Sequence, residues 1–477
     1  IGRQVAIATY GLTASGVRRP TEMKGDAWIG LVYAITNTLL KIRELKSRIS
    51  SLRGKVGMGG QLKRSQEELH SYAAVASELE GRNKELFSAI LERVEADEDP
   101  NLTISDLSRK YEMGDPSVKR TVRKVVDECV KGFDQTLSKI GVSFDSWDWE
   151  SSYVWSGDVG KVVDALRKTP YVSEVDGAHV LSTSRIVDDR DLRERLGIGG
   201  RYEISDLTLT RSDGTTLYTT RDMAYSLWKL ERANRVINVI GFDQSLAQIQ
   251  LKLALSVLGH EDVFDRMVHY VHELVRLPGI KMARRLGRYV TLDQVIDEAE
   301  SLAYRIVSEK SGELPEDKRR EIASFVATGA IRYALASVDP LKTVDFRWER
   351  VLDFEQNSGP FIQYAHARAS NILARAKEEP KNPDFHLLDH ELEHKLVWLV
   401  SRFPDVFIRA CERLRPNLIA DFANELAEAF NSYYAGVPVL KAKPEGLRDA
   451  RLMLVKAIRI TLRNSLKLLG IHSPDRM

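Results

Sequence analysis

The sequence predicts an α/β part built on a doubly wound parallel sheet, followed by an all-α domain. The first indication is a short apolar, β-branched run over residues 236–240, which Gly241 closes and helical apolar spacing over residues 246–257 follows. A parallel strand buried on both faces that leads into a helix is one unit of such a sheet, and ligands bind at the carboxyl ends of its strands. The second indication is helical periodicity with little strand signal from about Leu352 onward, which places the boundary near residues 345–355.

Length and composition indicate a soluble globular protein of about three domains, at ~100–200 residues each. The chain has 477 residues, of which 43% are hydrophobic and 29% charged, and it contains no run of 18 apolar residues. We therefore expect no membrane association, no leader in this sequence, and a cytoplasmic location. Cys129 and Cys411 are far apart, which argues against a disulfide framework or a zinc site and suggests two buried or idle thiols in a reducing cytosol.

The N-terminal region is expected to hold a strand at Val5–Tyr10, a helix from about Asp26, and then a charged insert. Residues 41–70 carry eight Lys/Arg against three acids, and residues 78–99 carry eight acids against three basic residues. One interpretation is two solvated helical arms that pair by charge around the glycine-rich turn at 53–60. The other is a basic arm that contacts RNA phosphates.

Three further signals order the middle of the chain. A helix is expected from Pro116 to Ile140, because proline is tolerated in a first helical turn. Residues 161–213 show short strands and turns that alternate with a helix, as in an insertion within the sheet. Thr291 and Gln294 fit a capping box, so a helix should start at Leu292, and helices should continue through Ala336.

Four sequence blocks, in order, carry a resemblance to a known family. They are Tyr218-Thr-Thr-Arg-Asp222, Gly241-Phe-Asp-Gln244, the Lys281-Met282 loop and Gln363-Tyr-Ala-His-Ala-Arg368. With these blocks the chain resembles an arginyl-tRNA synthetase, a class I aminoacyl-tRNA synthetase. The resemblance implies ATP-dependent activation of arginine and its transfer to tRNA(Arg). It implies ATP with Mg²⁺ as a substrate, no permanent cofactor and no protein-bound metal.

The resemblance also implies a domain organisation. A Rossmann-like catalytic domain, incomplete at its N-terminus, would occupy residues 1–300, with the charged insert at about 41–99 and a connective insertion at about 140–212. A helical region that contacts the tRNA stem would follow at 301–350. An all-helical, DALR-type anticodon-binding bundle would occupy residues 351–477.

Tyr218, Asp222 and Gln244 match the residues with which the family binds arginine. A carboxylate suits a guanidinium because it accepts two parallel, charge-assisted hydrogen bonds from the planar fork. Lysine would fit such a site poorly, because an ammonium group cannot make the forked contact. Without the neighbouring blocks, Asp222 would instead be interpreted as a helix cap and Tyr218 as a core residue.

The resemblance assigns ATP to Gly241, Asp243, Lys281 and Met282. Transfer of an adenylyl group expels pyrophosphate, and cations on a flexible loop stabilise the developing negative charge. Here the loop, which resembles the family's KMSKS signature, lacks its serine and second lysine. Lys281, Arg284 and Arg285 are therefore the candidate catalytic cations, although an Arg fork is not equivalent to a Lys point charge.

The start of the chain, Ile1-Gly-Arg-Gln-Val-Ala-Ile, resembles the stretch that follows the family's HIGH loop. We therefore expect a fragment or one half of a split enzyme, with a separate N-terminal segment that carries HIGH as a further partner. On this interpretation the chain alone forms no detectable arginyl-adenylate. The alternative function is a tRNA-binding fragment or paralogue without ligase activity.

The helical C-terminal domain should bind tRNA. Tyr364, His366 and Arg368 open it on a helix, where aromatic rings or Arg planes could stack on anticodon bases. The last helix, Leu447 to Leu469, has one apolar face, and on another face it carries a basic stripe of Lys456, Arg459, Arg463 and Lys467. Such a stripe suits RNA phosphates, or is simply solvated.

His390 and His394 match the HExxH pattern of zinc peptidases. A zinc peptidase also needs a third ligand and a cleft beside a sheet. The pattern here lies in a charged segment of the all-helical domain. We therefore expect a plain surface helix at this position.

Overall fold

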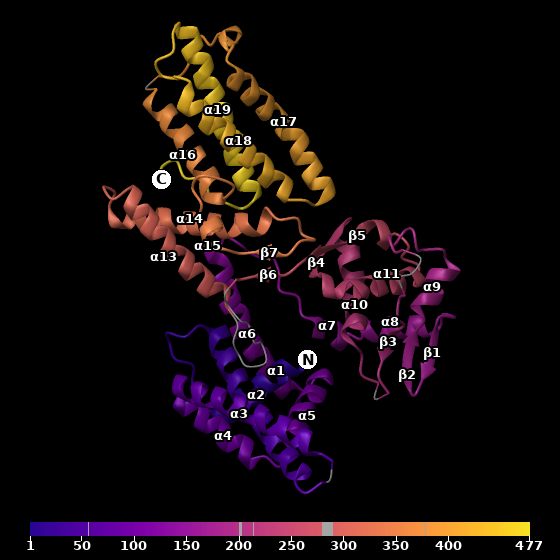
Figure 1. The fold of residues 1–477 in the computed structure, drawn as a ribbon. Coiled ribbons are helices and arrows are strands. Elements are labelled where there is room, and N and C mark those ends of the chain that lie inside the picture. Colours follow the sequence, from indigo (N-terminus) through magenta and orange to yellow (C-terminus); the bar gives the residue numbers. More distant parts are fainter. Residues whose placement is uncertain (56, 200–202, 213, 279–289, 377) are drawn as a thin grey trace.

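The computed structural model describes residues 1–55, 57–199, 203–212, 214–278, 290–376 and 378–477. Figure 1 shows N-terminal helices at one end of the molecule and a C-terminal helical bundle at the other. A long helix pair connects these ends, and an α/β part lies to one side between them. Four hydrophobic cores correspond to these parts.

Helices make up the N-terminal part. They are α1 (Arg3–Ser15), α2 (Gly25–Leu52), α3 (Gly59–Arg82), α4 (Lys84–Ala96), α5 (Pro100–Glu112) and α6 (Pro116–Lys139). The strand expected at Val5–Tyr10 is wrong, because these residues belong to α1. Residues 6–11 are all buried, so the helix shows no polar face that would reveal its period, and a continuous apolar run fits a strand equally well. Gly11 lets α1 approach α2 closely, since a Cβ there would overlap the Thr36 hydroxyl.

The charged insert forms an antiparallel helix pair, as expected. Helix α2 ends at Leu52, α3 begins at Gly59, and Gly54 and Gly57 between them have φ of 80° and 82°. Among the described residues, no ion pair joins the basic stretch 41–70 to the acidic stretch 78–99, so the expected charge pairing between the arms is not found. Arg43 instead donates hydrogen bonds to backbone carbonyls at the end of α4, among them that of Glu98 at 2.7 Å.

The first half of the α/β part confirms the expected alternation of strands and helices. It contains α7 (Glu150–Trp155), α8 (Asp158–Arg167) and α9 (Thr183–Asp189). Its antiparallel sheet has the order β1 (Val172–Val175), β2 (Ala178–Leu181) and β3 (Leu207–Thr210).

The second half contains a parallel strand pair, of which the sequence predicts the first strand. Strand β4 (Val236–Gly241) pairs with β5 (Met267–His272), with Val236 opposite Met267. Around it lie α10 (Tyr218–Arg232), the 3-10 turn η1 (Phe242–Gln244), α11 (Ser245–Val257) and α12 (Val263–Arg266). The prediction that β4 is buried on both faces is wrong: Ile237 is 42% and Val239 64% exposed, because α10 and α11 lie over only the face that carries Asn238.

The connecting region confirms the capping box. Helix α13 (Leu292–Lys310) begins with mutual hydrogen bonds between Thr291 and Gln294, of 2.9 and 3.2 Å. Its first turn is tied to the N-terminal helices, because Asp293 accepts hydrogen bonds from Lys24 at 2.6 Å and Lys139 at 3.2 Å. The remaining elements are α14 (Glu316–Ala336), α15 (Trp348–Val351) and the parallel pair β6 (Val275–Arg276) and β7 (Val344–Asp345).

The C-terminal bundle is helical throughout its described residues, as predicted. It consists of α16 (Gly359–Arg375), the 3-10 turn η3 (Phe385–Leu387), α17 (Glu391–Arg413), α18 (Asn417–Gly436) and α19 (Glu445–Leu468). The predicted apolar face of α19 is confirmed, since Leu454, Ile458, Leu462 and Leu466 are buried in the core. In the part of the chain that the structure describes, no helix has both the length and the apolar character needed to cross a bilayer.

Candidate active site and tRNA interface

Tyr218 and Gln244 meet just beyond the carboxyl end of β4. Tyr218 is the first residue of α10, Gln244 is the last residue of η1, and the Tyr218 hydroxyl donates a hydrogen bond to Gln244 Oε1 at 3.0 Å. Tyr218 is 58% exposed, so it is not the core residue of the alternative interpretation. The two polar groups are thus joined to each other and open to a ligand.

Asp222 lies one helical turn after Tyr218 and therefore on the same side of α10. Its side chain is 28% exposed, and it does not cap the helix, which begins four residues earlier. Gln248, one turn after Gln244 on α11, donates to Asp222 Oδ2 at 3.4 Å. The structure therefore brings the three predicted arginine-binding residues together on the facing ends of α10 and α11.

Gly241 and Asp243 stand at the same end of the sheet. A Cβ on Gly241 would lie 2.7 Å from Asp243 Oδ1, so a side chain here would displace that carboxylate. Gln244 Nε2 donates to the other oxygen, Asp243 Oδ2, at 3.1 Å. The remaining candidates for ATP binding and catalysis, Lys281, Met282, Arg284 and Arg285, lie outside the described residues.

Three polar residues that were not predicted from the sequence lie behind Asp222. Lys229 donates a hydrogen bond to Asn238 Oδ1 at 2.9 Å, and Asn238 donates to Gln248 Oε1 at 2.8 Å. Burial lowers the pKa of Lys229, and the nearby Asp222 carboxylate opposes this shift. A signal was present in the sequence, because Asn238 interrupts an otherwise apolar, β-branched strand.

Arg221, next to Asp222, has a structural role. Its side chain is 14% exposed, and its guanidinium donates to Glu112 at 2.7 Å and to Glu150 at 3.2 Å. These bonds join α10 to α5 and α7, so neighbouring residues of one block serve different purposes.

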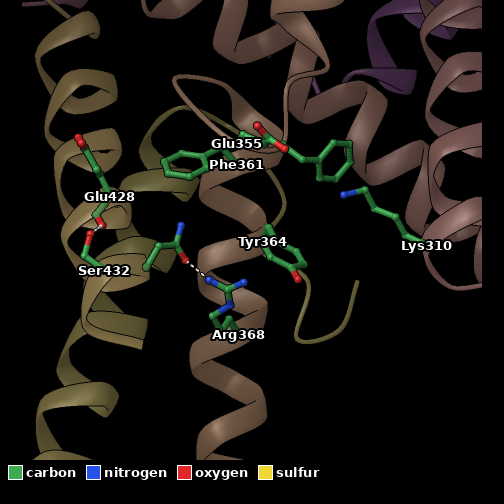
Figure 2. Close-up of a pocket in the computed structure, with 9 residues that line it drawn as sticks. Lys310, Glu355, Phe361, Tyr364, Arg368, Glu428 and Ser432 are labelled. Atoms are coloured by element: carbon green, nitrogen blue, oxygen red, sulfur yellow. Dashed lines mark hydrogen bonds between the residues drawn. The ribbon is translucent and has the colours of Figure 1, made fainter. Parts of the chain in front are cut away.

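Tyr364 and Arg368 lie together on α16, beside a cavity of about 430 Å³ (Figure 2). The Arg368 guanidinium lies 4.8 Å from the ring centre of Tyr364 and 4.3 Å from that of Tyr434. It donates a hydrogen bond to Asn431 at 2.6 Å, which directs it towards α18. A second cavity, of about 580 Å³, is lined by Arg368, Tyr434 and the last residue, Met477. This arrangement offers aromatic faces and a fixed planar cation beside open space.

His366, on the same helix, is buried in the protein, unlike Tyr364 and Arg368 beside the cavities. It is only 2% exposed, and its Nδ1 lies 3.0 Å from the carbonyl oxygen of Pro474, in a pairing that attaches the C-terminal tail to α16. Burial lowers the pKa of His366. The expectation that its ring stacks on an anticodon base is therefore corrected, because the ring faces the protein interior.

The basic stripe of α19 is only partly free among the described residues. Lys456 pairs with Glu379 at 3.2 Å, and Arg459 lies 4.0 Å from Asp475. Arg463 and Lys467 are exposed and have no ion pair within the described ranges. Two cations of the predicted stripe therefore remain fully available to an anion.

The HExxH histidines shape the start of α17. His390 Nδ1 accepts a hydrogen bond from the Leu392 amide at 3.1 Å, and His394 Nε2 lies 2.8 Å from the Leu388 carbonyl oxygen. Glu393, between them, points inward to Arg451. Over the described residues no group of metal-ligating side chains is found.

Two family profiles cover most of the chain. Residues 60–348 match the profile described as tRNA synthetases class I (R), catalytic domain. Residues 362–477 match the DALR anticodon binding domain.

Curated relatives match along the whole chain. The arginine–tRNA ligase of Ignicoccus hospitalis is 42% identical over 483 residues, which cover 100% of this chain and 73% of that protein. The arginine–tRNA ligase of Saccharolobus solfataricus is 36% identical and is covered to 75% of its length.

Solved structures of arginyl-tRNA synthetases also resemble this chain. The arginyl-tRNA synthetase of Thermus thermophilus superposes with a TM-score of 0.67 at 26% identity, over 99% of this chain and 86% of that one. That of Plasmodium falciparum, at 18% identity, shares the fold with a TM-score of 0.64 over 82% of this chain and 63% of that one. With the polar groups at the end of β4 and the helical C-terminal bundle in place, these matches show that the chain belongs to the class I arginyl-tRNA synthetase family.

Proposed function

We propose that this chain acts as an arginine–tRNA ligase, which activates arginine with ATP and transfers it to tRNA(Arg). The supporting observation is the Tyr218–Gln244 pair with Asp222 one turn away, in a chain that matches ligases along its whole length. Arginylation of tRNA tests the proposal directly. The assay uses this chain fused to the part of the Ignicoccus hospitalis relative that lies outside the match. Equal charging with lysine, or tRNA binding without arginylation, would contradict it.

In the proposed site, Asp222 accepts the two forked hydrogen bonds of the arginine guanidinium. Tyr218 and Gln244 add neutral hydrogen bonds from the same side.

Gly241 and Asp243 border the ATP site with Lys281 and Met282, and the nucleotide enters with Mg²⁺. Lys281, Arg284 and Arg285 stabilise the negative charge that develops on the phosphates as pyrophosphate leaves. The cytoplasmic location stays a prediction.

We assign the anticodon to the surface around Tyr364 and Arg368. Arg368 is held between two tyrosine rings and next to two cavities, so a splayed base can stack on an aromatic face or on the guanidinium plane. The exposed end of α19, with Arg463 and Lys467, supplies phosphate contacts.

Replacing Arg463 and Lys467 together by alanine is expected to weaken tRNA binding and to reduce its salt dependence. Each phosphate contact releases counterions, so losing two cations should lower the slope of log K against log salt by roughly two. Filter binding over a salt series measures this slope. The control is Lys318→Ala/Arg320→Ala, which removes two cations that are paired within α14. Equal slopes for wild type and the α19 variant would show that the stripe is merely solvated.

A second RNA contact is proposed at the tip of the α2–α3 pair. Six exposed cations gather there, no acid lies between Glu44 and Glu67, and these cations form no ion pair among the described residues. They are Lys46, Arg48, Arg53, Lys55, Lys63 and Arg64. Helix α3 begins among them without a side-chain cap or an acid in its first turn, so its free amides add positive potential.

The same filter-binding series tests this tip. Lys63→Ala/Arg64→Ala should also lower the slope by roughly two if both cations contact phosphates. A slope equal to that of wild type, together with a reduced slope in the α19 variant, would confine RNA binding to the C-terminal bundle.

A further inference from the structure

A closed ring of four side chains lies behind the proposed arginine site. Lys229 contacts Asn238 at 2.9 Å, Asn238 contacts Gln248 at 2.8 Å, Gln248 contacts Asp222 at 3.4 Å, and Lys229 Nζ lies 3.8 Å from Asp222 Oδ1. The members come from α10, β4 and α11, three elements that meet at this point. Asn238 and Gln248 are 9% and 6% exposed, so the half of the ring that they form is shielded from water.

Lys229 is an unusual member, because burying an ammonium group is costly unless it is paired. Its side chain is 18% exposed and lies 4.5 Å from the ring centre of Tyr225. Among the described residues, Asp222 is the carboxylate within ion-pair distance of it. The packing therefore places a cation, at the cost of desolvation, next to the group that is to recognise another cation.

The ring gives each oxygen of Asp222 its own partner. Oδ1 faces Lys229 at 3.8 Å and the Ser226 hydroxyl at 3.5 Å, while Oδ2 faces Gln248 at 3.4 Å. These distances exceed the 2.7–2.9 Å of strong charge-assisted hydrogen bonds. A carboxylate has about four acceptor sites, so partners at this range orient its plane and leave acceptor capacity for a ligand.

We propose that Lys229 is a positioning residue which, through this ring, holds the Asp222 carboxylate in the plane that a guanidinium fork requires. This inference rests on the proposed arginine site and adds a cause of its selectivity. Two parallel hydrogen bonds need a fixed carboxylate plane, whereas an ammonium group is a compact charge that accepts many orientations. Loss of Lys229 therefore weakens the binding of free arginine more than the binding of free lysine. It also removes a positive charge that repels every incoming cation.

The test measures binding of radiolabelled arginine and lysine to the full chain by equilibrium dialysis. In Lys229→Met the preference for arginine over lysine should fall by about tenfold, which corresponds to one orienting interaction. Lys229→Arg, which keeps a cation, should recover part of the preference. The matched control is Lys252→Met, because Lys252 on α11 is also partly buried with a lowered pKa but is not a partner of Asp222.

Gln248→Met provides a second route, since it removes the partner of the other oxygen and should reduce the preference in the same direction. Thermal unfolding of each variant separates misfolding from this effect. If Asp222→Ala abolishes arginine binding but Lys229→Met and Gln248→Met keep the wild-type preference, the positioning inference is overturned and the proposed site stands. If wild type shows no saturable arginine binding, or Asp222→Ala binds arginine normally, the proposed site itself is wrong.

Discussion

Asp222→Ala should reduce kcat/KM for arginine more than a hundredfold and leave the KM for ATP nearly unchanged. Asp222 lies one helical turn after Tyr218, which is hydrogen-bonded to Gln244, and Tyr218 and Gln244 offer neutral hydrogen bonds only. A lost pair of charge-assisted hydrogen bonds, at roughly 3 kcal/mol or more, corresponds to this factor. The measurement is arginylation kinetics in the fusion with the Ignicoccus hospitalis segment.

Two further variants sharpen this test. Asp222→Asn keeps the shape of the side chain but should recover little activity, because its amide presents a donor to a cation. Asp265→Ala removes an exposed carboxylate that pairs with Arg195 and should leave the kinetics unchanged. If the Asp222 variants stay within about threefold of wild type for arginine, another residue holds the guanidinium.

Arg451→Met should destabilise the C-terminal bundle by about 3–5 kcal/mol, as expected when a buried ion pair loses one partner. Arg451 Nε donates to Glu393 Oε1 at 2.7 Å, and the two side chains are 11% and 0% exposed. The variant would leave Glu393 charged in the interior, where its other oxygen still accepts from the His390 amide at 3.0 Å. Chemical unfolding measures the loss, and tRNA affinity should fall with the folded fraction.

Two controls accompany this prediction: one breaks an ion pair at the surface, and the other removes both charges of the buried pair. Arg402→Ala breaks a 3.9 Å pair with Glu425 at the surface and should cost less than about 1 kcal/mol. Glu393→Gln/Arg451→Met removes both charges of this pair and should recover part of the stability. A cost below about 1 kcal/mol for Arg451→Met would mean that water or a neighbouring group already compensates Glu393.

Local sequence patterns predicted some features of this fold and missed others. The capping box at Thr291 and the apolar face of α19 were predictable, because their physical causes lie within a few residues of one another. The helix at Val5–Tyr10 was not, since a segment that is covered on every side has no polar face to reveal its period. The burial of His366 depends on Pro474, which lies 108 residues away.

The sequence by itself determined the family blocks, the residue types suited to a guanidinium, and the division into an α/β part and a helical bundle. Only the tertiary structure decided which faces are covered: Ile237 and Val239 are exposed on β4, while Asn238 between them faces Lys229 and Gln248. Periodicity states that alternate residues share a face, but it does not state which distant segment packs on that face. The ring behind Asp222 joins three elements that become neighbours only on folding, and this is why sequence reasoning singled out Asp222 but missed Lys229, Asn238 and Gln248 behind it.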